Sequence, residues 1–161
     1  MTELITIVNY ALDTLYENDA ELIQQKVHER SIVFRFGLYF NDLLKKSQDF
    51  KKYDLDFDYN RSIEDTKRTR SRPEGIYPDL ILHKRGSNDR NVLALEFKTH
   101  WNSDSSDDID KLKELTSSDQ QYRFQLGISI VLGQRRNQCT FTYLRRGGAV
   151  PNVKEFVKEA G

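Results

Sequence analysis

Apolar side chains recur every three or four residues through the first part of the chain, a pattern typical of helices that bury one face. The repeat in residues 4–16 consists of Leu4, Val8, Ala11, Leu12 and Leu15. Asn18-Asp19 then offers a helix stop and a new N-cap, and a second repeat predicts a helix over about residues 20–46. Its apolar members are Val33, Phe36, Phe40 and Leu43. One further step of four towards the N-terminus leads to Glu29, an acid where an apolar residue is expected.

Over residues 53–59 a period of two replaces the helical period, which indicates a strand with one polar face. The polar positions, which we expect to face solvent, are Asp54, Asp56 and Asp58. Residues 60–75 show neither period and predict a long loop, whose basic residues include Lys67, Arg68, Arg70 and Arg72. Residues 77–83 and 92–99 are rich in strand-forming residues, and the stretch between them contains the turn-forming residues 85–89. These two segments are therefore expected to form a hairpin.

The rest of the chain predicts a helix, two strands and a short closing helix. Ser105-Ser106 followed by aspartates is typical of a capped helix start, with Ile109, Leu112 and Leu115 on the buried side. Residues 124–132 and 138–144 predict strands, and the closing helix would bury Val153, Phe156 and Val157. The order ααβββαββα over 161 residues favours a single α/β domain, residues 1–161, with a mixed central sheet flanked by helices.

The amino-acid composition limits the cellular compartment and the binding partners that we expect for this chain. The apolar runs are only a few residues long, far short of the ~18 to 20 residues that cross a bilayer. The start Met1-Thr2-Glu3 lacks the basic residues of a secretory signal, and Cys139 is the single cysteine, so we expect a reducing, cytoplasmic setting. The 25 basic and 25 acidic residues cancel, which counts against the strongly basic balance of many nucleic-acid-binding domains.

The predicted hairpin brings candidate chemistry together. When the chain is folded about Asn88, Asp79 lies nine residues before the centre and Glu96 eight after it, so the two carboxylates meet on neighbouring strands. Lys98 lies two residues beyond Glu96 and shares its face, whereas Phe97 points into the opposite layer. A salt-bridged patch would explain such a cluster, but the flanking residues suggest strands buried on both faces. Carboxylates held there cost free energy unless a partner or a metal ion neutralises them.

These residues carry a resemblance to a known superfamily. Tyr77-Pro78-Asp79, then Glu96-Phe97-Lys98, preceded by a helix bearing Glu29, resembles the PD-(D/E)XK nucleases, which include restriction endonucleases, Holliday junction resolvases and RecB-type nucleases. Their core is a helix, three antiparallel strands, a helix and a further strand, and it corresponds to about residues 20–144. The resemblance implies a restriction-endonuclease-like fold in which Asp79, Glu96 and the Phe97 carbonyl bind Mg²⁺ or Mn²⁺. Lys98 would orient the attacking water or stabilise developing charge, and Glu29 would complete the site.

Two classes of function follow from this resemblance. The first is a Mg²⁺-dependent endo- or exonuclease that hydrolyses DNA, with phosphate contacts from Lys67, Arg68, Arg70 and Arg72. The second is a non-catalytic module of the same fold that binds nucleic acid or another protein. A phosphatase of small substrates ranks last because the chain has no Gly-rich phosphate cradle. Sequence-specific cutting by so short a chain would require a homodimer or a larger complex.

For the other polar and aromatic residues the sequence gives no strong functional signal, and structural roles are the simplest interpretation. The three histidines, His28, His83 and His100, have no tight metal-ligand spacing. Trp101 and Tyr122 are suited either to stacking on bases or to packing inside the protein. Cys139 is expected to be an inert strand residue because no neighbouring base can be named for it.

Overall fold

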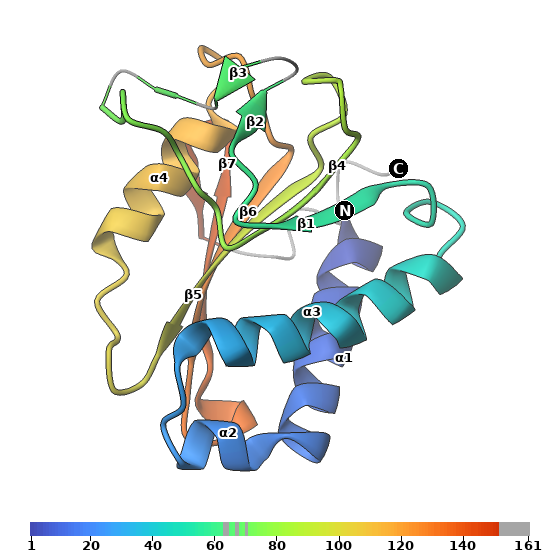
Figure 1. The fold of residues 1–161 in the computed structure, drawn as a ribbon, viewed down its shortest axis with the longest axis vertical. Coiled ribbons are helices and arrows are strands. Elements are labelled where there is room, and N and C mark those ends of the chain that lie inside the picture. The colour runs from blue at the N-terminus through green and yellow to red at the C-terminus, as the bar shows by residue number, and fades with distance from the viewer. Residues whose placement is uncertain (63–64, 67, 70, 152–161) are drawn as a thin grey trace.

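The computed structural model describes residues 1–62, 65–66, 68–69 and 71–151. Over these residues the chain forms an α/β structure with a six-stranded mixed sheet flanked by helices (Figure 1). The helices are α1 (Thr2–Asn18), α2 (Ala20–Gln24), α3 (Glu29–Lys46) and α4 (Ser106–Thr116), with a 3₁₀ turn, η1 (Arg136–Gln138). The sheet strands are β1 (Asp54–Phe57), β4 (Leu80–His83), β5 (Leu93–Thr99), β6 (Leu126–Leu132), β7 (Thr140–Arg145) and β8 (Gly148–Val150). The short closing helix expected near Phe156 lies outside the described residues.

Strand pairing follows the order β1-β4-β5-β6-β7-β8. Strands β5 and β6 run parallel and are connected through α4, while every other neighbouring pair in this sheet is antiparallel. The predicted hairpin of β4 and β5 is confirmed, and its register pairs Leu80 with Leu95 and Ile81 with Ala94. The two strands predicted after α4 are also present, as β6 and β7. Each of the four strands β4 to β7 is shorter than expected.

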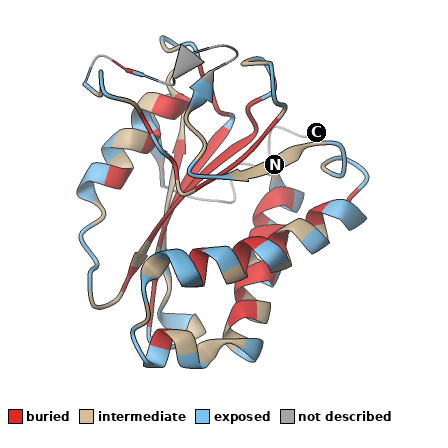
Figure 2. Ribbon diagram, viewed as in Figure 1, coloured by how far each residue is buried: buried red, intermediate tan, exposed pale blue. Residues whose placement is uncertain are grey.

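Alternation along β4 and β5 divides the core between the two faces of the sheet. Leu80, Leu95 and Phe97 belong to the larger apolar cluster, with α1 and α3. Ile81 and Ala94 belong to the smaller one, with α4. Figures 1 and 2 show α1 and α3 on one side of the buried central strands and α4 on the other. Because side chains of a strand alternate between faces, Glu96 and Lys98 point to the same side as Ala94, towards α4.

The predicted helix over residues 20–46 is wrong in one respect, because it is two helices. Helix α2 ends at Gln24, Lys26 adopts a left-handed backbone (φ 53°), and His28 is extended. His28 is the N-cap of α3, where its ring Nδ1 accepts a hydrogen bond from the Arg30 N–H at 3.3 Å. The break makes Glu29 the first residue of α3, so its carboxylate lies at the positive end of the helix dipole.

The expected loop of residues 60–75 is partly regular. It contains two two-residue strands, β2 (Arg61–Ser62) and β3 (Asp65–Thr66), which pair with each other and not with the main sheet. None of the helices in the described part of the chain is long and apolar enough to span a bilayer.

Candidate functional site

Asp79 and Glu96 lie next to each other at the α4 side of the sheet. Extending the register of β4 and β5 by one residue places Asp79 opposite Glu96. The Phe97 backbone N–H donates a 2.8 Å hydrogen bond to Asp79 Oδ2, which fixes the carboxylate against β5. Burial raises the pKa of Asp79, and the Phe97 N–H counteracts this only in part. Hairpin geometry deduced from the sequence thus brings these two acids together.

Glu96 is almost fully enclosed, with 1% of its surface exposed. Its Oε2 accepts a 2.9 Å hydrogen bond from Lys111 Nζ, and the same ammonium lies 3.5 Å from Asp108 Oδ1. Burial, and then repulsion from Asp79, raises the pKa of Glu96 well above its ordinary value despite the Lys111 ammonium. A buried carboxylate of this kind is held in the site at a cost in stability.

Lys98 reaches the same cluster from β5. Its Nζ lies 3.1 Å from Oδ2 of Asp108, a residue of α4 that is 4% exposed. Burial alone would lower the pKa of Lys98, but the hydrogen bond and ion pair with Asp108 outweigh it, and the pKa is raised. Lys98 therefore stays protonated at neutral pH and can act as a fixed positive charge.

Glu29 approaches the cluster from the first turn of α3. Burial raises the pKa of Glu29, and the negative charges of Asp79 and Asp108 raise it further. The Lys98 ammonium lowers this pKa, but not enough to cancel the rise. Glu29 Oε2 is buried and has no hydrogen-bond partner within the described ranges. Glu29 also lines one pocket together with Asp79, so the structure places the helix-borne acid near one of the two strand-borne acids.

These six residues, which we call the acidic cluster, are Glu29, Asp79, Glu96, Lys98, Asp108 and Lys111. Four carboxylates against two ammonium groups leave a formal charge of −2 when all are ionised. Burial raises the pKa of Glu29, Asp79 and Glu96, and either protons or a cation can neutralise the excess of negative charge.

A Mg²⁺ ion fits the donor chemistry of the acidic cluster. Glu96 Oε1, like Glu29 Oε2, is buried without a hydrogen-bond partner among the described residues, and carboxylate oxygens are the ligands that Mg²⁺ prefers. No group of three or more His, Cys, Asp or Glu residues in the described ranges is already arranged to hold a metal ion. The fit is thus to a site with few protein ligands, in which water and substrate oxygens complete the shell.

Sequence reasoning missed Asp108 and Lys111. It assigned the acids at the start of α4 to capping and the helix dipole. The signal that was present is their spacing, since Asp108 and Lys111 share the helix face of the buried Leu112 and Leu115. Charged residues on an apolar stripe indicate a paired or functional role.

The basic residues of the loop before β4 have varied surroundings. Lys67 and Arg70 lie outside the described residues. Arg68 is exposed, and its backbone N–H and carbonyl both bond the Tyr122 hydroxyl, at 2.5 and 2.8 Å. Arg72 instead forms a 2.6 Å ion pair with Asp107 of α4. A phosphate contact by Arg72 stays a prediction, and it would compete with this pair.

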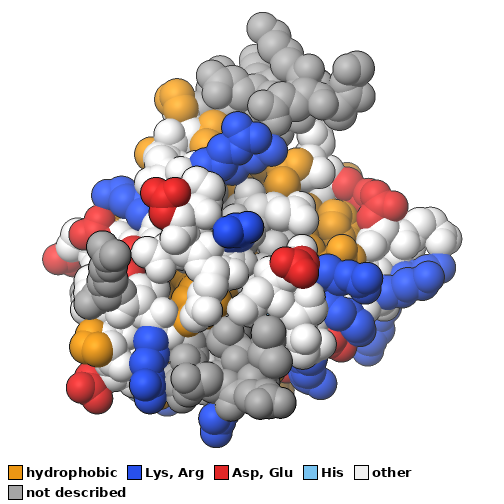
Figure 3. Space-filling model, turned by 90° about the horizontal axis from the view of Figure 1, so that it is seen from above, with side chains coloured by type: hydrophobic (Ala, Val, Ile, Leu, Met, Phe, Trp, Pro, Cys, Tyr) orange, Lys and Arg blue, Asp and Glu red, His pale blue; other side chains and the backbone are white. Residues whose placement is uncertain are grey.

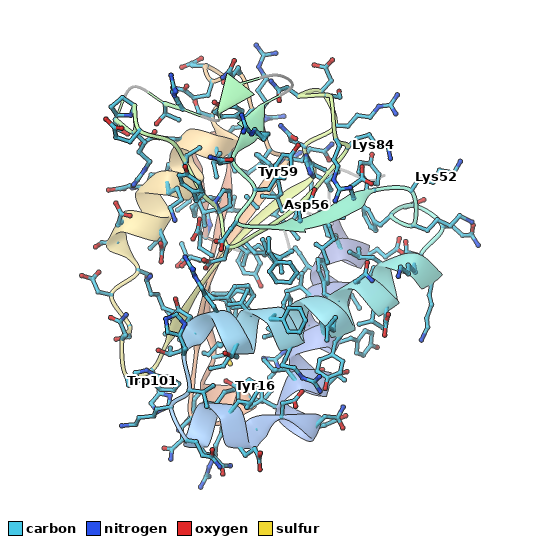
Figure 4. The ribbon with its side chains drawn as sticks, in the orientation of Figure 1. Tyr16, Lys52, Asp56, Tyr59, Lys84 and Trp101 are labelled. Atoms are coloured by element: carbon cyan, nitrogen blue, oxygen red, sulfur yellow. The ribbon has the colours of Figure 1, made fainter. Side chains whose placement is uncertain are left out.

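Charge is mixed on the face of the molecule that is seen from above in Figure 3. Figure 3 shows Lys and Arg side chains at several separate places, with acidic and apolar side chains between them. Tyr122 is fully buried, so of its two expected roles the structure supports packing. The Trp101 ring meets the His100 ring edge-on, with the two ring centroids 4.8 Å apart. Trp101 packs against the core and lies beyond the end of β5 that is farther from Asp56 (Figure 4).

The expectation that Asp54, Asp56 and Asp58 form a solvent face is wrong for the first two. Asp56 lies 2.8 Å from Nε2 of the buried His83 and accepts two hydrogen bonds from Arg85. Burial alone would raise the pKa of Asp56, but these partners hold it below its usual range. Asp54 pairs with Lys84 at 3.2 Å. The polar face of β1 therefore consists of ion pairs with the neighbouring strand and turn.

Comparisons with models of protein families, with curated proteins and with solved structures gave no match to this chain.

Proposed function

We propose that the protein is a Mg²⁺-dependent nuclease of the PD-(D/E)XK type, with a restriction-endonuclease-like core, and that it hydrolyses phosphodiester bonds of DNA. The observation that carries the proposal is the convergence of Asp79, Glu96 and Lys98 on one face of two paired strands, around a buried excess of negative charge. A merely structural ion-pair cluster has no need of that excess. A divalent cation with a bound phosphate uses it.

In this proposal Asp79, Glu96 and the Phe97 carbonyl hold the metal ion. Bound Mg²⁺ would polarise a phosphoryl oxygen and lower the pKa of a bound water. Lys98, kept protonated by Asp108, stabilises charge that develops on the phosphate and does not act as a base. Glu29, whose pKa is raised by burial, is suited to hydrogen-bond a water beside the phosphate.

Lys111 has a different role from Lys98. Its ammonium contacts Glu96 Oε2 and donates a 3.4 Å hydrogen bond to the Tyr77 carbonyl, two residues before Asp79. This contact lowers the cost of the buried Glu96 carboxylate when no metal ion is bound. Lys111 therefore positions the two strand-borne acids and opposes the rise in the pKa of Glu96.

The test is cleavage of labelled DNA and RNA, in duplex, branched and single-stranded forms, with Mg²⁺, Mn²⁺ or EDTA. Wild-type protein should cleave with Mg²⁺ or Mn²⁺ and not with EDTA. Lys98→Ala should lower turnover about 10² to 10³-fold with little change in nucleic-acid affinity, because it removes a contact used mainly in the transition state. Asp79→Ala should also weaken metal binding. Lys113→Ala, on the exposed side of α4, is the matched control and should cleave like the wild type.

A non-catalytic module of the same fold is the competing proposal. It is the correct one if the protein binds nucleic acid or a protein partner but never cleaves above the Lys98→Ala background, whichever metal ion is supplied. If cleavage is sequence-specific, we propose that the protein acts as a homodimer or within a larger complex, which sedimentation of the purified protein with its substrate tests directly.

A further inference from the structure

An apolar pocket of about 200 Å³ opens directly beside the acidic cluster. We call it the aromatic pocket, and its walls include Glu29, Val33, Phe34, Phe57, Asp58 and Asp79. Two of these residues, Glu29 and Asp79, also belong to the acidic cluster. A ligand in the pocket would therefore adjoin the site where the phosphate is proposed to bind.

The two phenylalanines of the pocket are exposed rather than buried in the core. Phe34 on α3 is 53% exposed and Phe57 on β1 is 38% exposed, and their ring centroids lie 6.1 Å apart. The Phe57 ring lies over Gly37, where an added Cβ would come within 2.0 Å of its Cζ atom. The glycine thus leaves room for the ring beside the pocket. Exposed aromatic rings are suited to stacking on another planar ring.

Charge at the pocket restricts what can occupy it. Three carboxylates, those of Glu29, Asp58 and Asp79, lie in its walls together with one cation, the exposed Arg30, whose guanidinium is 3.9 Å from Asp58, so the formal charge of the lining is negative. A phosphate or carboxylate group would be repelled from these walls. An uncharged ring with N–H donors is favoured, because the buried Glu29 Oε2 lacks a hydrogen-bond partner among the described residues. The volume, below the ~300 to 1,000 Å³ of drug-sized sites, is that of a small ring system.

We propose that the aromatic pocket binds one unpaired nucleobase of a single-stranded segment whose phosphate lies at the acidic cluster. The substrate class is therefore single-stranded or locally unpaired nucleic acid, and this inference rests on the proposed function. Nucleobases meet each requirement, since they are planar and uncharged, and those with amino groups donate hydrogen bonds to carboxylates. A base held in a duplex stack cannot present its face to Phe34.

The test compares the affinities of Phe34→Ala and the wild type for a short labelled single-stranded DNA and for the matching duplex. Ca²⁺, a cation that prefers oxygen ligands, is present in both measurements. Loss of one stacking contact should weaken single-strand binding roughly 5- to 150-fold and leave duplex binding unchanged. Tyr10→Ala, at a 58% exposed aromatic residue on α1, is the matched control and should bind both forms like the wild type. Gly37→Ala should reproduce the loss, because the new Cβ displaces the Phe57 ring without removing an aromatic residue.

Abasic substitutions in the single strand identify the contact itself. In the wild type, one abasic position should weaken binding by about the same factor as Phe34→Ala. In Phe34→Ala that abasic position should have no further effect, since the two changes remove the same contact. Independent, multiplicative losses would overturn the inference.

The remaining outcomes separate this inference from the proposed function. Equal losses for single strand and duplex, or for Phe34→Ala and Tyr10→Ala, would overturn the base pocket and leave the nuclease proposal intact. Selective single-strand binding through Phe34 without any cleavage would overturn the nuclease and support the base pocket. A wild-type dimer that dissociates on Phe34→Ala substitution would show that a second copy of the chain covers the pocket, and the inference would then be wrong.

Discussion

Replacing Lys111 by methionine removes the buried ammonium that contacts Glu96, while it keeps a side chain of similar length and apolar bulk. Lys111 and Glu96 are 13% and 1% exposed at their side chains, so water cannot replace the lost partner. Asp108 keeps a second cation, since Lys98 lies 3.1 Å from it. The substitution therefore acts mainly on Glu96, and it also removes the 3.4 Å hydrogen bond to the Tyr77 carbonyl.

The expected loss follows from the geometry. At 2.9 Å, and with an effective dielectric constant of about 20, the attraction between Lys111 and Glu96 is about 6 kcal/mol. Desolvation of the Lys111 ammonium, which the variant avoids, offsets part of this. Removing one partner of a buried ion pair commonly costs ~3 to 5 kcal/mol, and we expect a loss of this size in the metal-free protein at alkaline pH.

The loss should depend on pH in a defined direction. The folded-state pKa of Glu96 is raised, so its protonated form contributes stability that is present at low pH and is lost as the pH rises through that raised value. Without Lys111 the pKa rises further, and each unit adds about 1.4 kcal/mol to the loss at high pH. At a pH below the raised pKa of Glu96, where its carboxyl is protonated, the variant should have nearly the stability of the wild type.

Urea denaturation of both proteins at about pH 5 and pH 9, with EDTA or with Mg²⁺, measures this directly. Mg²⁺ should stabilise Lys111→Met more than the wild type, because the formal charge of the acidic cluster falls from −2 to −3. The control is Lys113→Met, whose pair with Asp110 is exposed and contributes ~1 kcal/mol at most. A loss that is the same at both pH values would refute the electrostatic reasoning, and an equal response to Mg²⁺ would refute the metal site.

Four further predictions concern Glu96, Gly133, Arg68 and Arg72. Glu96→Gln should abolish cleavage and yet raise the free energy of unfolding of the metal-free protein at neutral pH, because it removes the desolvation of a buried carboxyl and its repulsion from Asp79, while Lys111 keeps Asp108 as a partner; urea denaturation and the cleavage assay together test this. Gly133→Ala should lower stability by ~1 to 3 kcal/mol in thermal unfolding, since its Cβ would lie 2.5 Å from that of Gln138 and 2.6 Å from the backbone there. Arg68→Ala should reduce the log-log salt slope of duplex binding by about 0.9 if Arg68 contacts a phosphate, whereas Arg72→Ala should release the loop from α4 and increase its proteolysis.

The sequence by itself determined the paired acids of the candidate site. Strand-forming residues on both sides of a short turn specify a hairpin, and a hairpin has one geometric consequence for residues equally far from its centre. Asp79 and Glu96 therefore meet whatever the rest of the chain does. The alternation of side chains also placed Lys98 beside Glu96 and Phe97 in the opposite layer, where its ring packs 4.9 Å from that of Phe36.

Two local features could not be predicted from the hydrophobic periodicity of the sequence. The break between α2 and α3 depends on the left-handed backbone of Lys26 and on the helix cap formed by His28. Neither lysine nor histidine is a residue type that predicts a helix end. The alternating pattern of β1 predicts that Asp56 faces solvent. The pairing of β1 with β4 instead places His83, 27 residues away in the sequence, next to Asp56. Local patterns report the face on which a side chain lies, and they do not report what covers that face.

Only the tertiary structure decided which groups complete the acidic cluster. The parallel crossover from β5 to β6 lays α4 across the sheet, and this brings Asp108 and Lys111 onto Lys98 and Glu96. The helical repeat of α4 specifies its buried face but not its position along the strands, which depends on how its apolar residues pack against β6 and β7. The charge balance of the site, and with it the pKa of Glu96, is a property of that packing, because electrostatic energy depends on distances and burial that only the assembled chain defines.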